Sequence, residues 1–476
     1  MDEETPLLQQ QSEDAPKTRT PFPWRQFSIL LMLQVSEPLT SQVISPFLPQ
    51  LIRDIGVTKG DDSRIGYYVG LMHSLFFLTE ACTIFHWSRI SDHVGRKPVL
   101  LTGLFGLSIS MYCFGLSETF RGLVISRCLN GALNGNIGIM KSMVAEITDS
   151  TNIAQAYGIL PFAWGAGSTL GPLIGGSLAR PVDRFPGVFG HSAFLKKYPY
   201  FLPCAIPATF TALSWLITLL FMKETRKPQK PLREYLPWAK HESDASKTSP
   251  PSSVPPSGDE APVPFRGLLT RPVLIAAGSY ATFSLIDMAF RAVLPVFYAT
   301  SIDMGGLNLD PPAIGTILSI YGMVNGVIVF FIFTPMHDWL GARTMFLVTT
   351  CACIPMIALF PIMNLVARQQ GFTNTVWVLV SLQMAFLMIS NLAYGITFIF
   401  ISAAAPNRAS IGATNGLAQM IVSLMRAIGP AVVNSAFSLG VERHSTGGNL
   451  AYWVMVVMVG MTLAVGFALP KDMWKK

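Results

Sequence analysis

Six ionisable residues interrupt long apolar stretches, and they are the first candidates for chemistry: Glu37, Glu80, Arg127, Asp287, Arg291 and Arg426. A charged side chain inside a membrane-spanning helix is costly, so it marks a functional site by default. A carboxylate that alternates between charged and neutral states could carry protons or bind a cationic substrate. We therefore take Glu37 and Asp287 as candidates for proton coupling or substrate binding.

Structural alternatives exist for several of these residues. Glu37 could be a structural acid that is satisfied by Arg127 or by the nearby backbone. Asp287 and Arg291 are four positions apart and could pair on one helix face. Glu80 could interact with the nearby end of its own span. For Asp287 and Glu80, function and structure remain equally open at this level.

Two short charged motifs repeat at matching places in the two halves of the chain. The stretch from Ser88 to Leu100 connects two apolar runs and contains Asp92, Gly95 and Arg96, and a fainter copy contains Asp338, Gly341 and Arg343. Glycine permits a tight turn. Asp92 could pair with Arg96 or cap a neighbouring helix. The apolar spans are expected to form two helix bundles, and rocking of one bundle against the other would break such a pair. We therefore expect the first motif to be a cytoplasmic latch. A plain basic loop would explain Arg96 but not Asp92 or Gly95.

The elements that must position these residues are membrane helices. Of the 476 residues, 51% are hydrophobic and 13% are charged, against about 25% charged in soluble domains. Continuous apolar runs favour helices over a barrel. The net charge of +7 resides mostly at segment ends, where basic residues set orientation, so nucleic-acid binding is not expected.

Twelve apolar segments are long enough to span a bilayer at about 20 residues each. We expect an all-α membrane protein with two six-helix bundles. The predicted spans are 27–52, 64–87, 98–118, 121–145, 154–179, 200–222, 267–298, 312–334, 343–366, 375–400, 410–438 and 450–469.

A polar Pro/Ser-rich stretch divides the spans into two sets of six. We predict a tail at 1–26, an N-terminal bundle at 27–222, a linker at 223–266, a C-terminal bundle at 267–470 and a tail at 471–476. An even number of spans places both tails and the linker on one side. Their basic residues make that side cytoplasmic by the positive-inside rule.

Small residues form a stripe in the fifth span. Gly167, Gly171, Pro172, Gly175 and Gly176 would let helices approach closely, and the proline would bend the helix. Gly416, Gly429 and Pro430 repeat part of this pattern in the eleventh span. Such matching halves are typical of a secondary transporter with its site between two bundles.

These motifs together resemble the major facilitator superfamily over the whole chain outside the tail and linker. The family's loop after span two reads G-x-L-A-D-R-x-G-R-K, and here Ser88 and His93 replace its opening Gly and its first Arg. Arg127 and Gly131 match its R-x-x-x-G element. The fifth span is similar to the G-x-x-x-G-P-x-x-G-G signature of twelve-span drug:proton antiporters, especially fungal members and the plant zinc-induced facilitator-like proteins.

The resemblance implies a gating role for the charged loop and a role in proton transfer for Arg127. It implies proton-coupled export of a small organic molecule, such as a drug or secondary metabolite, by alternating access. The alternatives are vacuolar loading of a metabolite or metal chelator, and a non-transporting receptor on the same fold. A monomer in the lipid bilayer is expected to suffice.

Other features of the sequence concern sorting and enzyme activity. The N-terminal tail contains Glu3, Leu7 and Leu8, which resemble an acidic dileucine signal for an adaptor that sorts proteins to vacuoles or lysosomes. The membrane could therefore be the plasma membrane or the vacuolar membrane. No Walker loop, catalytic triad or metal-ligand spacing is present, so we expect neither an enzyme nor a cofactor nor a metal site.

Overall fold

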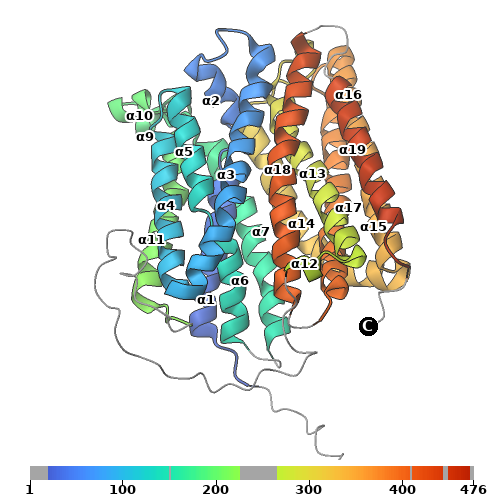
Figure 1. Cartoon of the computed structure of the whole chain (residues 1–476). Helices are drawn as coiled ribbons and strands as arrows, with labels where there is room; N and C mark the ends of the chain where they lie inside the picture. Colours follow the sequence, from blue (N-terminus) through green and yellow to red (C-terminus); the bar gives the residue numbers. More distant parts are fainter. Residues whose placement is uncertain (1–19, 149–151, 226–264, 408–409, 443–448, 472–476) are drawn as a thin grey trace, which may run out of the picture.

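The computed structural model describes residues 20–148, 152–225, 265–407, 410–442 and 449–471, and within these residues there are helices and no strand. The long helices run side by side in two groups, one from each half of the chain (Figure 1). Counted over the described residues, they make twelve crossings, six in each bundle. The predicted all-α membrane fold is confirmed.

The N-terminal bundle contains six crossings, two of which consist of two helices. They are α1 (Trp24–Gln42) with α2 (Leu48–Ile55), α3 (Ile65–Val94), α4 (Arg96–Gly115), α5 (Phe120–Leu133) with α6 (Asn136–Ile147), α7 (Ile153–Leu178) and α11 (Phe201–Phe221). The short helices α8 (Pro181–Arg184), α9 (Pro186–Phe189) and α10 (Ala193–Lys197) join α7 to α11.

The C-terminal bundle repeats this arrangement after a one-turn helix. Its helices are α12 (Phe265–Leu268), α13 (Arg271–Ala299), α14 (Pro311–Leu340), α15 (Ala342–Cys351) with α16 (Cys353–Gln370), α17 (Asn374–Ala404), α18 (Ile411–Glu442) and α19 (Asn449–Phe467). Most of the predicted linker, residues 226–264, lies outside the described residues. The domain boundaries stay predictions.

The connection predicted between Ser88 and Leu100 is much shorter than expected. Helix α3 continues to Val94 and α4 begins at Arg96, so Gly95 alone separates them. A 30-residue helix is about 45 Å long at 1.5 Å per residue, which exceeds the roughly 30 Å hydrocarbon layer. The charged residues of this motif can therefore leave the apolar layer while remaining helical. Helix α14 likewise continues past the predicted end of its span at residue 334, and it ends at Leu340.

The crossings differ in helix length and hydropathy. Eight helical stretches in the described chain are long and apolar enough to span a membrane on composition alone, and they exclude the crossings of α1, α3, α5 and α7. These four contain Glu37, Glu80, Arg127 and the glycine stripe. Helices α5 and α6 of these crossings are short, with 14 and 12 residues, and all four crossings belong to the N-terminal bundle.

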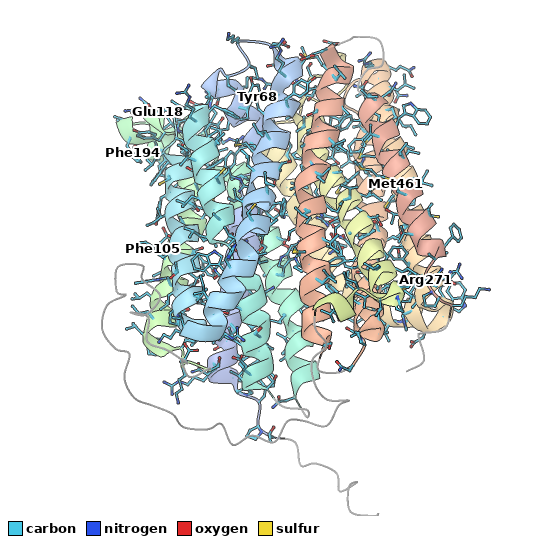
Figure 2. The ribbon with its side chains drawn as sticks, viewed as in Figure 1. Tyr68, Phe105, Glu118, Phe194, Arg271 and Met461 are labelled. Atoms are coloured by element: carbon cyan, nitrogen blue, oxygen red, sulfur yellow. The ribbon has the colours of Figure 1, made fainter. Side chains whose placement is uncertain are left out.

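The outer faces of the bundles suit contact with lipid. Figure 2 shows Phe105 on α4 and Met461 on α19 at opposite sides of the molecule. Their side chains are 55% and 46% exposed. Between the bundles, α3 packs on α18 and α7 packs on α14. We call the end with α2, the start of α3 and the end of α18 the α2 end, and it lies opposite the start of α1 (Figure 1).

Candidate transport site between the bundles

A buried acid and an arginine lie on two helices, α3 and α18, that pack together across the bundle interface. Glu80 of α3 is 4% exposed and accepts a hydrogen bond of 3.3 Å from the amide of Asn134. Its carboxylate also interacts electrostatically with Glu37 on α1 and with Arg426 on α18. Arg426 in turn interacts with Asp287 in its own bundle. The structure therefore links candidates from both halves and brings Glu80, which the sequence left open, into this group.

Asp287 and Arg291 form the predicted pair on α13. The guanidinium Nε of Arg291 lies 2.9 Å from both carboxylate oxygens of Asp287, and the Asp287 side chain is only 3% exposed. Tyr394 donates a hydrogen bond of 2.7 Å to the same carboxylate. Arg291 also donates to Asn391 at 2.9 Å and to Tyr321 at 3.2 Å. A network of neutral polar groups thus surrounds this ion pair.

Arg127 does not make the contact that would have explained Glu37 structurally. It is 2% exposed, donates to the carbonyl of Met72 at 3.4 Å and lies 4.9 Å from the ring centroid of Phe76. Its Nη1 has no hydrogen-bond partner among the described residues. A buried guanidinium with an unused N–H group can donate a hydrogen bond to a ligand, or to a new partner in another state. Arg127 thus stays a candidate for function, separate from the Glu37 group.

The first charged motif forms a network at the end opposite α2. Gly95 has φ of +111°, a backbone conformation that favours glycine. Arg96 donates to Glu146 of α6 at 3.0 and 3.1 Å. Glu224, which follows α11, accepts hydrogen bonds of 2.8 and 3.0 Å from the backbone N–H groups of Arg96 and Lys97. Helices α4 and α6 and the segment after α11 are therefore joined at this motif.

The acids described in this network are two that the sequence analysis did not name. Arg96 pairs with Glu146, and Glu224 caps α4, whereas the Asp92 side chain lies outside the described residues. Sequence analysis missed Glu146 and Glu224. Both lie far from the motif along the chain, and no spacing rule connects them to it. The part of Asp92 in a latch stays a prediction.

The second motif keeps the turn but makes a different contact. Gly341 has φ of +73°. Asp338 is 72% exposed, and the ion pair recorded for it is with the adjacent His337, at 3.3 Å. Arg343 donates to the backbone carbonyl of Phe467 on α19 at 2.8 Å. This motif therefore joins α15 to α19 without the carboxylate–arginine pair of the first motif.

The glycine stripe of α7 packs against two helices. A methyl carbon at Gly167 would lie 2.6 Å from the Val35 carbonyl oxygen of α1, and one at Gly175 would lie 1.8 Å from the Val43 carbonyl oxygen. On another face, a methyl carbon at Gly176 would lie 2.9 Å from the Cα of Gly315 in α14. Because real carbon contacts are longer, these positions accept only glycine without movement.

The remaining stripe residues fit the same packing. A methyl carbon at Gly171 would lie 3.1 Å from the Leu39 carbonyl oxygen of α1, and one at Gly315 would lie 2.4 Å from the Pro172 carbonyl oxygen. Helix α7 is thus held between α1 of its own bundle and α14 of the other.

The sorting residues Glu3, Leu7 and Leu8 lie outside the described residues. The described residues contain no cluster of three potential metal ligands.

Comparisons with known proteins agree with this geometry. Residues 30–430 match the family model described as Major Facilitator Superfamily. The efflux pump azaK of Aspergillus niger is 30% identical over 93% of this chain and 87% of its own. Protein ZINC INDUCED FACILITATOR 1 of Arabidopsis thaliana is 29% identical over 96% and 93%. A bacterial homologue of the lysosomal transporter Spinster, solved in an inward-facing conformation, superposes with a TM-score of 0.67 at 15% identity, over 96% of this chain and all of that one.

Proposed function

The chain belongs to the Major Facilitator Superfamily and is a secondary transporter, and we propose that it exports small organic molecules in exchange for protons by alternating access. The observation that carries the proposal is the group of Glu37, Glu80, Arg426 and Asp287: Glu80 and Asp287 are each 4% exposed, and their helices α3 and α13 both pack against α18, which contains Arg426. Protons moving down their gradient would neutralise Glu37 or Asp287. The substrate would leave in exchange.

The burial of these charges explains how the group could couple the movement of protons to the rocking of the bundles. An ionised carboxylate away from water needs a cation or hydrogen-bond donors beside it. When the bundles rock apart, Glu80 and Arg426 separate, because they belong to different bundles. Protonation of the acids would lower the cost of that separation. In the proposal, Asp287–Arg291 and Arg127 complete the site for protons or substrate.

The proposed gates follow from the two charged motifs and the glycine stripe. The network of Arg96, Glu146 and Glu224 ties α4 to the end of α6 and to the segment after α11. In the proposal this is the cytoplasmic latch, with Asp92 as its further acid. The tight contact of α7 with α14 would seal the path between the bundles. A single chain contains both bundles, so a monomer would suffice.

Replacing Glu37 by glutamine tests the coupling. Purified protein in liposomes with an acidic lumen is expected to accumulate members of a panel of labelled aromatic amines, neutral aromatics and carboxylates. The Glu37→Gln variant should lose at least about tenfold of the pH-driven uptake, because glutamine cannot carry the proton. Glu118→Gln is the matched control, since Glu118 lies at the α2 end and is 51% exposed.

Two outcomes would contradict the proposal. Normal pH-driven uptake by the Glu37→Gln variant would remove Glu37 from the coupling mechanism. Absence of uptake of every panel member by the unaltered protein would favour the alternative of a receptor on this fold. The efflux pump and the zinc-induced facilitator among the relatives support transport over the receptor.

Loading of a vacuole with a metabolite or metal chelator is the second candidate, and its motivation is the dileucine pattern. We propose that Glu3, Leu7 and Leu8 bind a sorting adaptor at the cytoplasmic surface. A fluorescently tagged Leu7→Ala/Leu8→Ala variant should then move from the vacuolar to the plasma membrane, with a Gln9→Ala/Gln10→Ala variant as control. Unchanged vacuolar location would rule out this signal, and plasma-membrane location of the unaltered protein would rule out the vacuolar role.

A further inference from the structure

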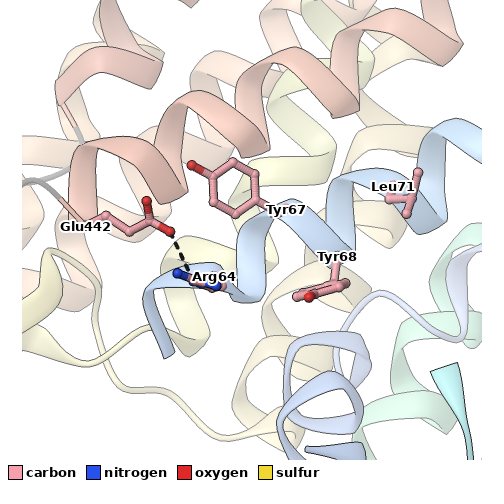
Figure 3. A pocket seen from close by; sticks show the side chains of 5 residues that line it. All are labelled: Arg64, Tyr67, Tyr68, Leu71 and Glu442. Atoms are coloured by element: carbon pink, nitrogen blue, oxygen red, sulfur yellow. Dashed lines mark ion pairs between the residues drawn. The ribbon is translucent and has the colours of Figure 1, made fainter. Parts of the chain in front are cut away.

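Polar contacts join the two bundles at the α2 end. Arg64, at the end of the turn before α3, lies 3.5 Å from the carboxylate of Glu442 at the end of α18, as Figure 3 shows. One turn further on, the backbone N–H of Tyr67 donates to the Ser438 hydroxyl at 3.2 Å. Both contacts join α18 to α3 or to the turn directly before it, and therefore cannot survive a separation of the bundles at this end.

The backbones of α3 and α18 are close along the same stretch. A methyl carbon at Gly66 would lie 2.4 Å from the Ser438 hydroxyl oxygen, and one at Gly70 would lie 2.7 Å from the Pro430 carbonyl oxygen. On the other side of the interface, Arg184 of α8 lies 3.9 Å from Asp310, which caps α14. The bundles are thus closed together at the α2 end.

Arg64 has a second partner within its own bundle. Its Nε lies 3.0 Å from Asp61 and 3.5 Å from Glu442. The hydrogen bonds from Ser63 hold the pKa of Asp61 below its usual value, so this carboxylate remains an anion in mildly acidic surroundings. A pocket of about 310 Å³ beside Arg64, lined also by Tyr67, Tyr68 and Leu71, gives the guanidinium room to turn.

We propose that Arg64 is a switching cation that closes the α2 end by pairing with Glu442 and is held by Asp61 when that end opens. The inference rests on the proposed alternating access. Arg64 contacts both Asp61 and Glu442 in the closed state and keeps Asp61 in the open state, so opening loses the Glu442 pair without leaving an unpaired arginine. Arg64 and Glu442 are positioning residues for transport, since neither is in the group around Glu37.

The proposed switch predicts that two substitutions change the ratio of open to closed protein in opposite directions. Dyes on Lys59→Cys and Asn449→Cys, in a chain whose six native cysteines are replaced, report the distance between the bundles at this end without any substrate. Glu442→Gln should raise the ratio of open to closed protein about two- to fivefold, and Asp61→Asn should lower it similarly, as expected for exposed ion pairs. Shifts in the same direction, or no shift, would overturn the proposal.

A disulfide tests whether this closure must open during transport. The Cβ carbons of Gly66→Cys and Ser438→Cys would lie 3.6 Å apart, within the 3.5–4.5 Å of ordinary disulfides. Oxidation should cross-link the pair and stop transport, and a reductant should restore it, while each single variant stays active. Transport by the cross-linked protein would overturn the gate. Distance shifts in a protein that transports nothing would instead leave the switch standing and reject the proposed function.

Discussion

Replacing Gly175 by alanine is expected to lower transport at least about tenfold and to lower the melting temperature. The added methyl carbon would lie 1.8 Å from the carbonyl oxygen of Val43, so α1 or α7 must move. Forcing one carbon into a packed interface costs about 1–3 kcal/mol. Val43 directly follows the helix that contains Glu37, and a shift of that helix would therefore displace the proposed coupling acid.

Gly165→Ala is the matched control for this prediction. It lies on the same helix, and a methyl carbon there meets no atom within 4 Å. Alanine also favours a helix over glycine by about 1 kcal/mol, so this variant should be as stable as the unaltered protein and transport normally. Scanning calorimetry and liposome uptake measure both effects. Equal behaviour of the two variants would show that the contact of α7 with α1 is not limiting.

The sequence predicted local features of the site correctly. The pairing of Asp287 with Arg291 follows from four-residue spacing on a helix, and the turn at Gly95 follows from its backbone freedom. The pair and the turn each depend only on residues that are close together in the chain, and residue type and spacing are enough to predict such features. The twelve crossings could likewise be predicted, because each must be apolar over about 20 residues.

Contacts between distant segments could not be predicted in this way. Glu146 and Glu224 bind Arg96 from positions 50 and 128 residues away, and Glu442 reaches Arg64 from the opposite half of the chain. Each is an ordinary acid at a helix end when considered alone. The extension of α3 through Ser88–Val94 could not be predicted for another reason, because a run of charged residues marks the end of the apolar layer and not the end of the helix.

Asp287→Asn is expected to have the largest effect on stability. It would leave Arg291 without a counter-ion inside the bundle, and removal of one partner of a buried pair costs about 3–5 kcal/mol. The Asp287→Asn/Arg291→Gln double variant removes both charges and should recover most of the lost melting temperature. Asp62→Asn is the control, because its pair with Arg53 is exposed and such pairs contribute about 0–1 kcal/mol.

Transport by the double variant separates the two roles that are open for Asp287. If the pair only holds α13 in place, recovery of stability should bring recovery of pH-driven uptake. If Asp287 takes part in coupling, the double variant should fold but lose its dependence on the pH gradient, because no carboxylate remains at that position. We expect the second result, since Asp287 also interacts with Arg426, which connects it to Glu80 across the bundle interface. Full pH-driven uptake by the double variant would assign Asp287 to structure and leave Glu37 and Glu80 as the coupling acids.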